Sequence, residues 1–120
     1  MVLDKEERDR RINAEVKRLA SLFKGIEPKR AKTIKNIINR AAFMQVSLED
    51  MEEDINTDGI IEEFTQDHVN FYERERPIVK TYNVMIKNYN STIKQLIDML
   101  PEKESKTVKN ELLEYLKGKK

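Results

Sequence analysis

Residues 76–101, RPIVKTYNVMIKNYNSTIKQLIDMLP, decide the fold of this chain, because two prolines bracket a long run of helical periodicity. Pro77 suits a first helical turn, where its missing N–H would have no partner, and Pro101 disfavours helical geometry at Leu100. The spacing predicts an amphipathic helix over residues 76–100 that must bury one face against a partner. Its apolar seam alternates steps of three and four residues: Val79, Tyr82, Ile86, Tyr89, Ile93, Leu96 and Leu100.

A second seam upstream supplies that partner. Pro28 suits the start of a helix over residues 28–56, and the same alternation of three and four follows it. Two helices of comparable length can bury such seams against each other. We therefore expect helices 28–56 and 76–100 to form a long antiparallel hairpin. The seam of the earlier helix consists of Ile34, Ile37, Ala41, Met44, Leu48, Met51 and Ile55.

Shorter elements complete the predicted fold, which is mainly α. Asp4 suits an N-cap and Gly25 suits a helix stop, so a first helix is expected over about residues 4–24. Two β-rich runs around a polar turn predict a small β-hairpin, with strands near 60–65 and 69–73. An isolated hairpin is marginally stable, so this one must pack on the helices or on a neighbour. A C-terminal helix is expected near 104–117.

Composition limits the class of protein. The 120 residues fit one domain, and the absence of cysteine excludes a disulfide framework and a cysteine zinc site. No apolar run approaches the roughly 20 residues that span a bilayer, and no signal-peptide pattern opens the chain. We expect a soluble intracellular protein without membrane contact. Elongated helical chains of this size often complete their core by oligomerising.

Charge divides the chain into three regions. Residues 1–40 hold twelve Lys or Arg against six Asp or Glu, residues 41–75 hold one against eleven, and residues 76–120 hold ten against five. We interpret 1–40 as a basic, DNA-binding helical region, 41–101 as the core and oligomerisation region, and 102–120 as a possible partner-binding tail. The acidic second half of helix 28–56 meets solvent, a basic neighbour or a bound cation.

The basic residues of the first 40 positions are the main functional signal. Two helices joined by GIEP at 25–28 form a helical hairpin whose cations can neutralise phosphates without reading bases. Arg8 belongs to the expected exposed face of the first helix. The alternative is a solvated face, because six acidic residues interleave with the basic ones. The residues expected to contact DNA are Arg10, Arg11, Lys17, Arg18, Lys24, Lys29, Arg30, Lys32 and Lys35.

Signals for catalysis or metal binding are sparse. His68 is the only histidine, and three glycines cannot supply a glycine-rich phosphate loop. The run DINTDG at 54–59 matches the start of a calcium loop, but Thr65 stands where a bidentate glutamate is needed. The alternative is a helix C-cap with Gly59 in a left-handed conformation. We expect no enzymatic activity and no cofactor, and cation binding at 54–65 stays open.

Three segments carry a family resemblance. ERERP at 73–77, YNVMIKNYN at 82–90 and IKQLIDMLP at 93–101 resemble the C-terminal signature of a phage terminase small-subunit family. The resemblance extends over about residues 40–101, although QDH at 66–68 replaces the Asn-Gly turn common in such proteins.

The resemblance implies a non-catalytic subunit that works in the host cytoplasm. Such a subunit recognises viral double-stranded DNA, assembles into a ring-shaped homo-oligomer and brings the DNA to the terminase large subunit, which holds the ATPase and nuclease. The alternative function is a helical adaptor whose basic face docks an acidic protein partner.

Overall fold

Three helices form the body of the molecule in the computed structural model, which describes residues 4–100 and 113–114. Helix α1 spans Lys5–Ala20 and continues as a short 3-10 turn, η1, over Ser21–Phe23. Helix α2 spans Pro28–Asp58, and helix α3 spans Pro77–Asp98. The expected helix at 104–117 and the tail at 102–120 lie outside the described residues, except for positions 113 and 114.

A β-hairpin joins α2 to α3. Strand β1 spans Ile61–Phe64 and pairs antiparallel with β2, which spans Tyr72–Glu75. With three helices and this two-stranded sheet, the predicted fold class is confirmed. In the described part of the chain, none of the helices has the length and hydropathy needed to cross a bilayer.

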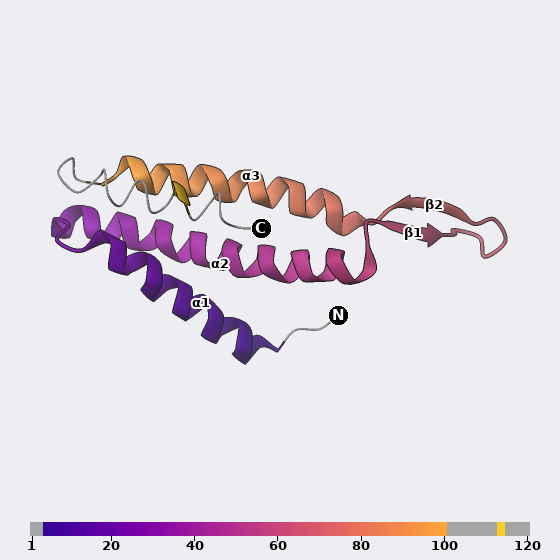
Figure 1. Ribbon diagram of the computed structural model, residues 1–120, viewed down its shortest axis with the longest axis horizontal. Coiled ribbons are helices and arrows are strands. Elements are labelled where there is room, and N and C mark those ends of the chain that lie inside the picture. The colour runs from indigo at the N-terminus through magenta and orange to yellow at the C-terminus, as the bar shows by residue number, and fades with distance from the viewer. Residues whose placement is uncertain (1–3, 101–112, 115–120) are drawn as a thin grey trace.

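Helix α2 is the central element, with α1 along one side and the antiparallel α3 along the other (Figure 1). Helices α2 and α3 touch along their predicted seams, so the long helical hairpin is confirmed. The end of α1 and η1 add Leu19 and Phe23 to the same core. The core residues contributed by α2 and α3 are Ile34, Ile37, Ile38, Ala41, Leu48, Tyr89, Ile93, Leu96 and Ile97.

Local signals account for most helix ends. The carboxylate of Asp4 accepts a hydrogen bond from the Glu6 backbone N–H at 3.1 Å and so caps α1. Pro28 and Pro77 stand in the first turns of α2 and α3, as expected. Gly59 has a φ of 81° and donates its N–H to the carbonyl of Ile55, which confirms the C-cap interpretation of this glycine.

The second strand begins three residues later than predicted, at Tyr72 rather than 69. The reason is Asp67, whose carboxylate accepts hydrogen bonds of 2.9 Å from the backbone N–H groups of both Val69 and Asn70. These bonds hold residues 69 and 70 in a turn and remove their N–H groups from the strand ladder.

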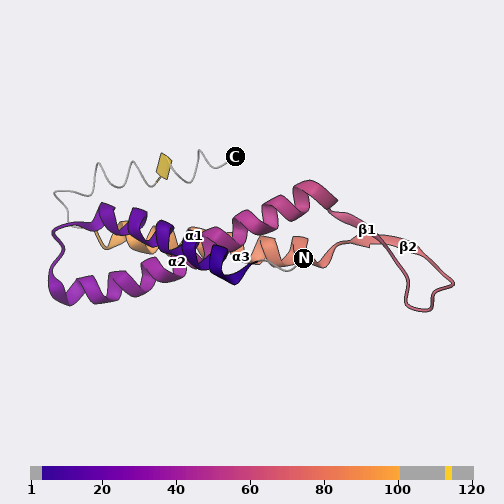
Figure 2. The same cartoon turned by 90° about the horizontal axis from the view of Figure 1, so that it is seen from below.

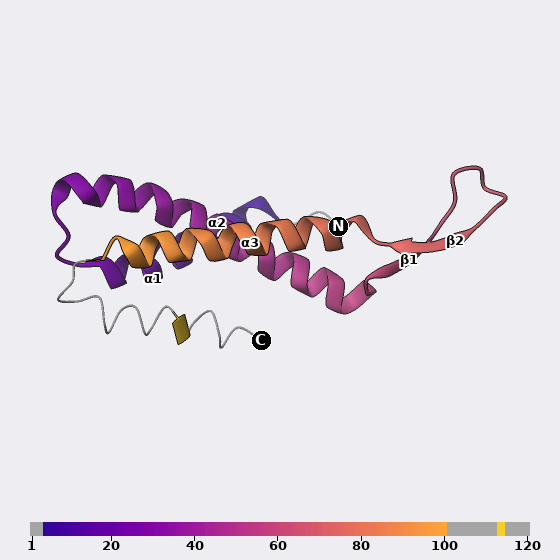
Figure 3. The same ribbon diagram turned by 90° about the horizontal axis from the view of Figure 1, so that it is seen from above.

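The hairpin projects away from the helical body instead of packing on it (Figure 1). Figure 2 and Figure 3, turned by 90°, show the same projection beyond the ends of α2 and α3. The molecule therefore measures 63 × 28 × 22 Å. Arg76 secures the base of the hairpin, because its guanidinium donates to the Gly59 carbonyl at 2.6 Å and to the Asp54 carboxylate at 2.5 Å.

Candidate nucleic-acid interface

Two arginines of α1 turn inward onto the acidic half of α2. Arg8 Nη1 lies 2.6 Å from one carboxylate oxygen of Asp50, and Arg11 Nη1 lies 2.7 Å from the other. Arg11 Nη2 also contacts Glu49 Oε1 at 2.9 Å. The Arg8 guanidinium donates to Ser47 Oγ at 3.0 Å and lies 5.6 Å from the ring centroid of Phe43. Together these contacts form a charged clasp between the two helices, which we call the α1–α2 clasp.

The α1–α2 clasp bears on two predictions: which arginines of the first helix are exposed, and what the acidic second half of helix 28–56 contacts. Arg8 and Arg11 do not lie on the freely exposed face of the first helix, since both side chains are partly buried against α2. The hydrogen bonds that the Arg11 guanidinium donates to the carboxylates of Asp50 and Glu49 raise the pKa of Arg11. The acidic half of α2 therefore has basic neighbours in the same chain: the α1 arginines at Glu49 and Asp50, and Arg76 at Asp54. Arg11 is a weaker candidate for DNA contact because binding a phosphate would mean breaking these bonds.

Two further candidate arginines are engaged within the molecule. Arg18 binds Glu15 through two hydrogen bonds of 2.7 and 3.0 Å along the same helix. Arg30 donates to the backbone carbonyl of Met99 and so ties the start of α2 to the end of α3. Both side chains remain partly or fully exposed, but their guanidinium groups are oriented by these partners.

The other six predicted residues are exposed, and five of them form two stripes. Arg10 and Lys17 lie seven residues apart on the exposed face of α1, which points away from the core, and Lys24 is exposed in the turn that follows η1. We call this set the α1 stripe. Lys29 and Lys32 lie on the outer face of the first turns of α2, and Lys35 lines an apolar hollow beside them.

The predicted DNA contacts did not include Arg40, although this residue belongs to the basic first half of helix 28–56. Arg40 lies two helical turns after Lys32 and shares its exposed face, so it extends the basic row along α2. We call Lys29, Lys32 and Arg40 the α2 stripe. Exposed cations in a row can contact successive phosphates without the cost of leaving a buried partner unpaired.

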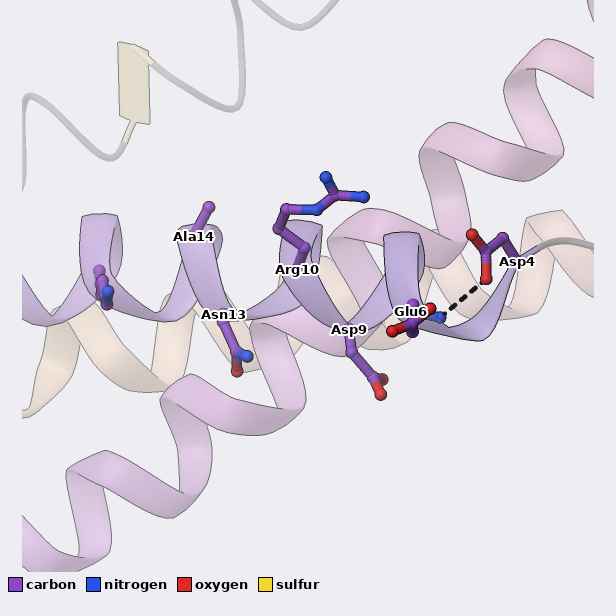
Figure 4. Close-up of a pocket in the computed structure, with 7 residues that line it drawn as sticks. Asp4, Glu6, Asp9, Arg10, Asn13 and Ala14 are labelled. Carbon is purple, nitrogen blue, oxygen red and sulfur yellow. Dashed lines mark hydrogen bonds between the residues drawn. The ribbon is translucent and has the colours of Figure 1, made fainter.

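The N-terminal end of the α1 stripe has a mixed charge. A shallow hollow of about 770 Å³ surrounds Arg10, and its lining includes the carboxylates of Asp4, Glu6 and Asp9 as well as Lys17. Figure 4 shows Arg10 projecting from α1 on the same side as Ala14, while Asp9 points to the other side. The three carboxylates weaken the attraction of an anion to Arg10, so the basic character of the surface is concentrated further along, at Lys17 and Lys24.

A metal site is the other kind of site that the sequence analysis considered, at residues 54–65. Within the part of the chain that the structure describes, no group of three or more His, Cys, Asp or Glu side chains is arranged to hold a metal ion. In the calcium-loop stretch, the carboxylate of Asp54 is paired with Arg76 at 2.5 Å. His68 lies in the exposed hairpin loop with a φ of 63°, as expected of a turn residue.

No protein-family model, curated protein sequence or solved structure matches this chain. The features that bear on function are therefore the two stripes, the α1–α2 clasp that fastens α1 to α2, and the resemblance of residues 73–101 to the terminase signature.

Proposed function

We propose that this chain is the non-catalytic small subunit of a phage DNA-packaging terminase, which binds viral double-stranded DNA and delivers it to the large subunit in the host cytoplasm. The observation that carries the proposal is the pair of exposed stripes on two adjacent helices. Their cations are Arg10 and Lys17 on α1, Lys24 in the turn after η1, and Lys29, Lys32 and Arg40 on α2. The resemblance of residues 73–101 to the terminase signature is the reason for assigning this surface to phage DNA packaging.

Binding would be electrostatic and repeated over many subunits. Each Lys or Arg that neutralises a phosphate releases a counterion, which contributes affinity that is independent of base sequence. A ring of subunits would present the stripes many times, and weak contacts would then add through avidity. The α1–α2 clasp holds α1 on α2 before DNA arrives, so less conformational freedom is lost on binding.

The test compares two variants with the same change of charge. Lys24, Lys29 and Lys32 are replaced together by Glu in the first variant, and Lys80, Lys87 and Lys94 in the second. The control residues are also exposed, and they lie at seven-residue intervals on α3. Gel retardation of duplex DNA over a range of salt concentrations is the measurement. The first variant should lose retardation and the second should keep most of it.

Two outcomes would count against the proposal. Equal loss in both variants would mean that net charge, not the stripes, drives binding. If the unaltered protein does not retard duplex DNA at low salt but binds an acidic protein, the adaptor function replaces the terminase function.

A further inference from the structure

The β-hairpin carries most of the large apolar side chains that the described residues leave in solvent. Ile60, Ile61, Val69, Phe71 and Tyr72 are exposed, and Val69 and Phe71 near the tip are 75% and 57% exposed. Such a concentration on one projecting element is typical of a surface that meets another molecule.

The tip is also held in one conformation. In addition to its hydrogen bonds from two backbone N–H groups, the Asp67 carboxylate accepts a hydrogen bond from the side-chain amide of Asn70 at 3.0 Å. Thr65 Oγ1 accepts the backbone N–H of His68 at 2.9 Å. A loop ordered in advance loses little freedom when it binds, so Val69 and Phe71 are presented as a ready-made apolar knob.

The net charge of the hairpin restricts the kind of partner that this apolar knob can bind. Residues 60–75 hold five carboxylates against one arginine, a net charge of −4. This charge repels nucleic acid. It also opposes pairing of one hairpin with another, which would add to the repulsion already present where Glu63 faces Glu73 across the strands. The favoured partner is a basic surface with an apolar hollow.

The other end of the same chain has such a surface. A hollow of about 250 Å³ lies between the end of α1 and the start of α2. It is lined mainly by apolar side chains, among them Phe23, Ile26, Ile34 and Ile38, together with Lys35. Residues 24–40 around it hold six Lys or Arg against one Glu. The volume is below the 300–1,000 Å³ typical of small-molecule sites, which suits a pair of inserted side chains.

We propose that the hairpin tip of one copy docks in the α1–α2 hollow of the next copy. Figure 1 places the hairpin and the turn between α1 and α2 at opposite ends of the molecule, which is 63 Å long, so the contact joins different copies. A head-to-tail contact of this kind repeats into a closed ring or an open filament. The inference deepens the assembly part of the proposed function and rests on it. Among the cations predicted to bind DNA, only Lys35 lines the hollow itself, while Lys24 and the α2 stripe belong to the basic surround that attracts the acidic hairpin.

Two variants, each altered at one end of the molecule, test the contact in the absence of DNA. The tip variant carries Val69→Ser and Phe71→Ser, and the hollow variant carries Ala31→Glu, which places a carboxylate at the edge of the hollow opposite an acidic tip. All three positions are exposed, so folding should be preserved. Val84→Ser on α3 is the control, because Val84 is exposed and apolar but belongs to neither end. Sedimentation and native mass spectrometry give the size of each assembly.

Each end variant alone should be monomeric, with self-association weakened about tenfold or more, while the Val84→Ser protein assembles like the unaltered chain. An equimolar mixture of tip and hollow variants should form a dimer and stop there, because each pair still has one intact tip and one intact hollow. Assembly of the tip variant like the unaltered chain, a mixture that stays monomeric, or a monomeric unaltered protein would overturn the proposal. If the unaltered chain assembles through this contact but does not retard duplex DNA, the proposed function fails while the contact stands, so the two failures are distinguishable.

Discussion

Arg11 and Asp50, 39 positions apart in the sequence, are joined by a 2.7 Å ion pair that fastens α1 to the acidic half of α2. The second oxygen of the same carboxylate binds Arg8, so Asp50 holds two guanidinium groups. The side chain of Asp50 is only 13% exposed, which shields these pairs from salt better than the exposed Lys5–Asp9 pair on α1. Part of the charge segregation along the chain therefore serves folding rather than ligand binding.

Replacing Asp50 with Ala should loosen α1. The change leaves two partly buried guanidinium groups without this partner, and hydrogen bonds to charged groups contribute about 1.5–3 kcal/mol each. We expect the free energy of unfolding to fall by about 2 kcal/mol, with faster amide hydrogen exchange concentrated in α1. Glu53→Ala, at an exposed position of the same helix, should change stability by less than about 0.5 kcal/mol. Unchanged exchange rates in α1 would show that the clasp does not hold the helix.

Tyr82 should give the protein a late alkaline transition. Burial, together with the 2.8 Å hydrogen bond that its hydroxyl donates to Glu52, raises the pKa of Tyr82 to about 12. The folded state favours the neutral phenol, so this contribution to stability is complete below the ordinary pKa of 10.0 and is lost between 10.0 and about 12. A tyrosinate absorbance titration should lose a step near pH 12 in Tyr82→Phe and keep it in Tyr72→Phe. A Tyr82 step centred near 10.0 would contradict the contact.

Asp67 should keep the hairpin loop ordered in mild acid. Hydrogen bonds from the backbone of Asn70 and Val69 lower the pKa of Asp67 from 3.8 to about 2. The stabilising effect is therefore present above pH 3.8 and disappears as the pH falls through about 2. In an NMR titration, the amide signals of Val69 and Asn70 should shift with a midpoint near 2. Asp67→Ala should abolish this step and disorder the loop at neutral pH, whereas Gln66→Ala should leave both unchanged.

Ile93 tests the contact between α2 and α3. Its side chain is 0% exposed within the seam of α3, so Ile93→Ala removes buried methyl groups and leaves a cavity. We expect the free energy of unfolding to fall by about 2–5 kcal/mol, measured from the denaturant midpoint. Val84→Ala on the same helix truncates a side chain that is 54% exposed, and its effect should be several times smaller. Comparable losses in the two variants would argue against a buried seam at Ile93.

The elements that sequence reasoning predicted best depend on local signals. The first residue of α2 and its last residue, Asp58, lie within about two positions of the predicted bounds, because Pro28 and Gly59 act on the backbone beside them. The strand after the hairpin loop was harder to place. Its residues have strand propensity, but the side chain of Asp67 competes for their backbone N–H groups, and that competition depends on loop geometry.

Periodicity, prolines and glycines by themselves determined two long helices with matching apolar seams, and the outward direction of Arg10 and Lys17, because each of these follows from spacing along a helix. Only the tertiary structure decided that Arg8 and Arg11 turn inward. Both residues flank the apolar face of α1, and which flank is covered depends on how α1 docks on α2 through Leu19 and Phe23. A charge pattern can therefore locate a basic helix, but contacts between helices determine which of its cations remain free to bind a polyanion.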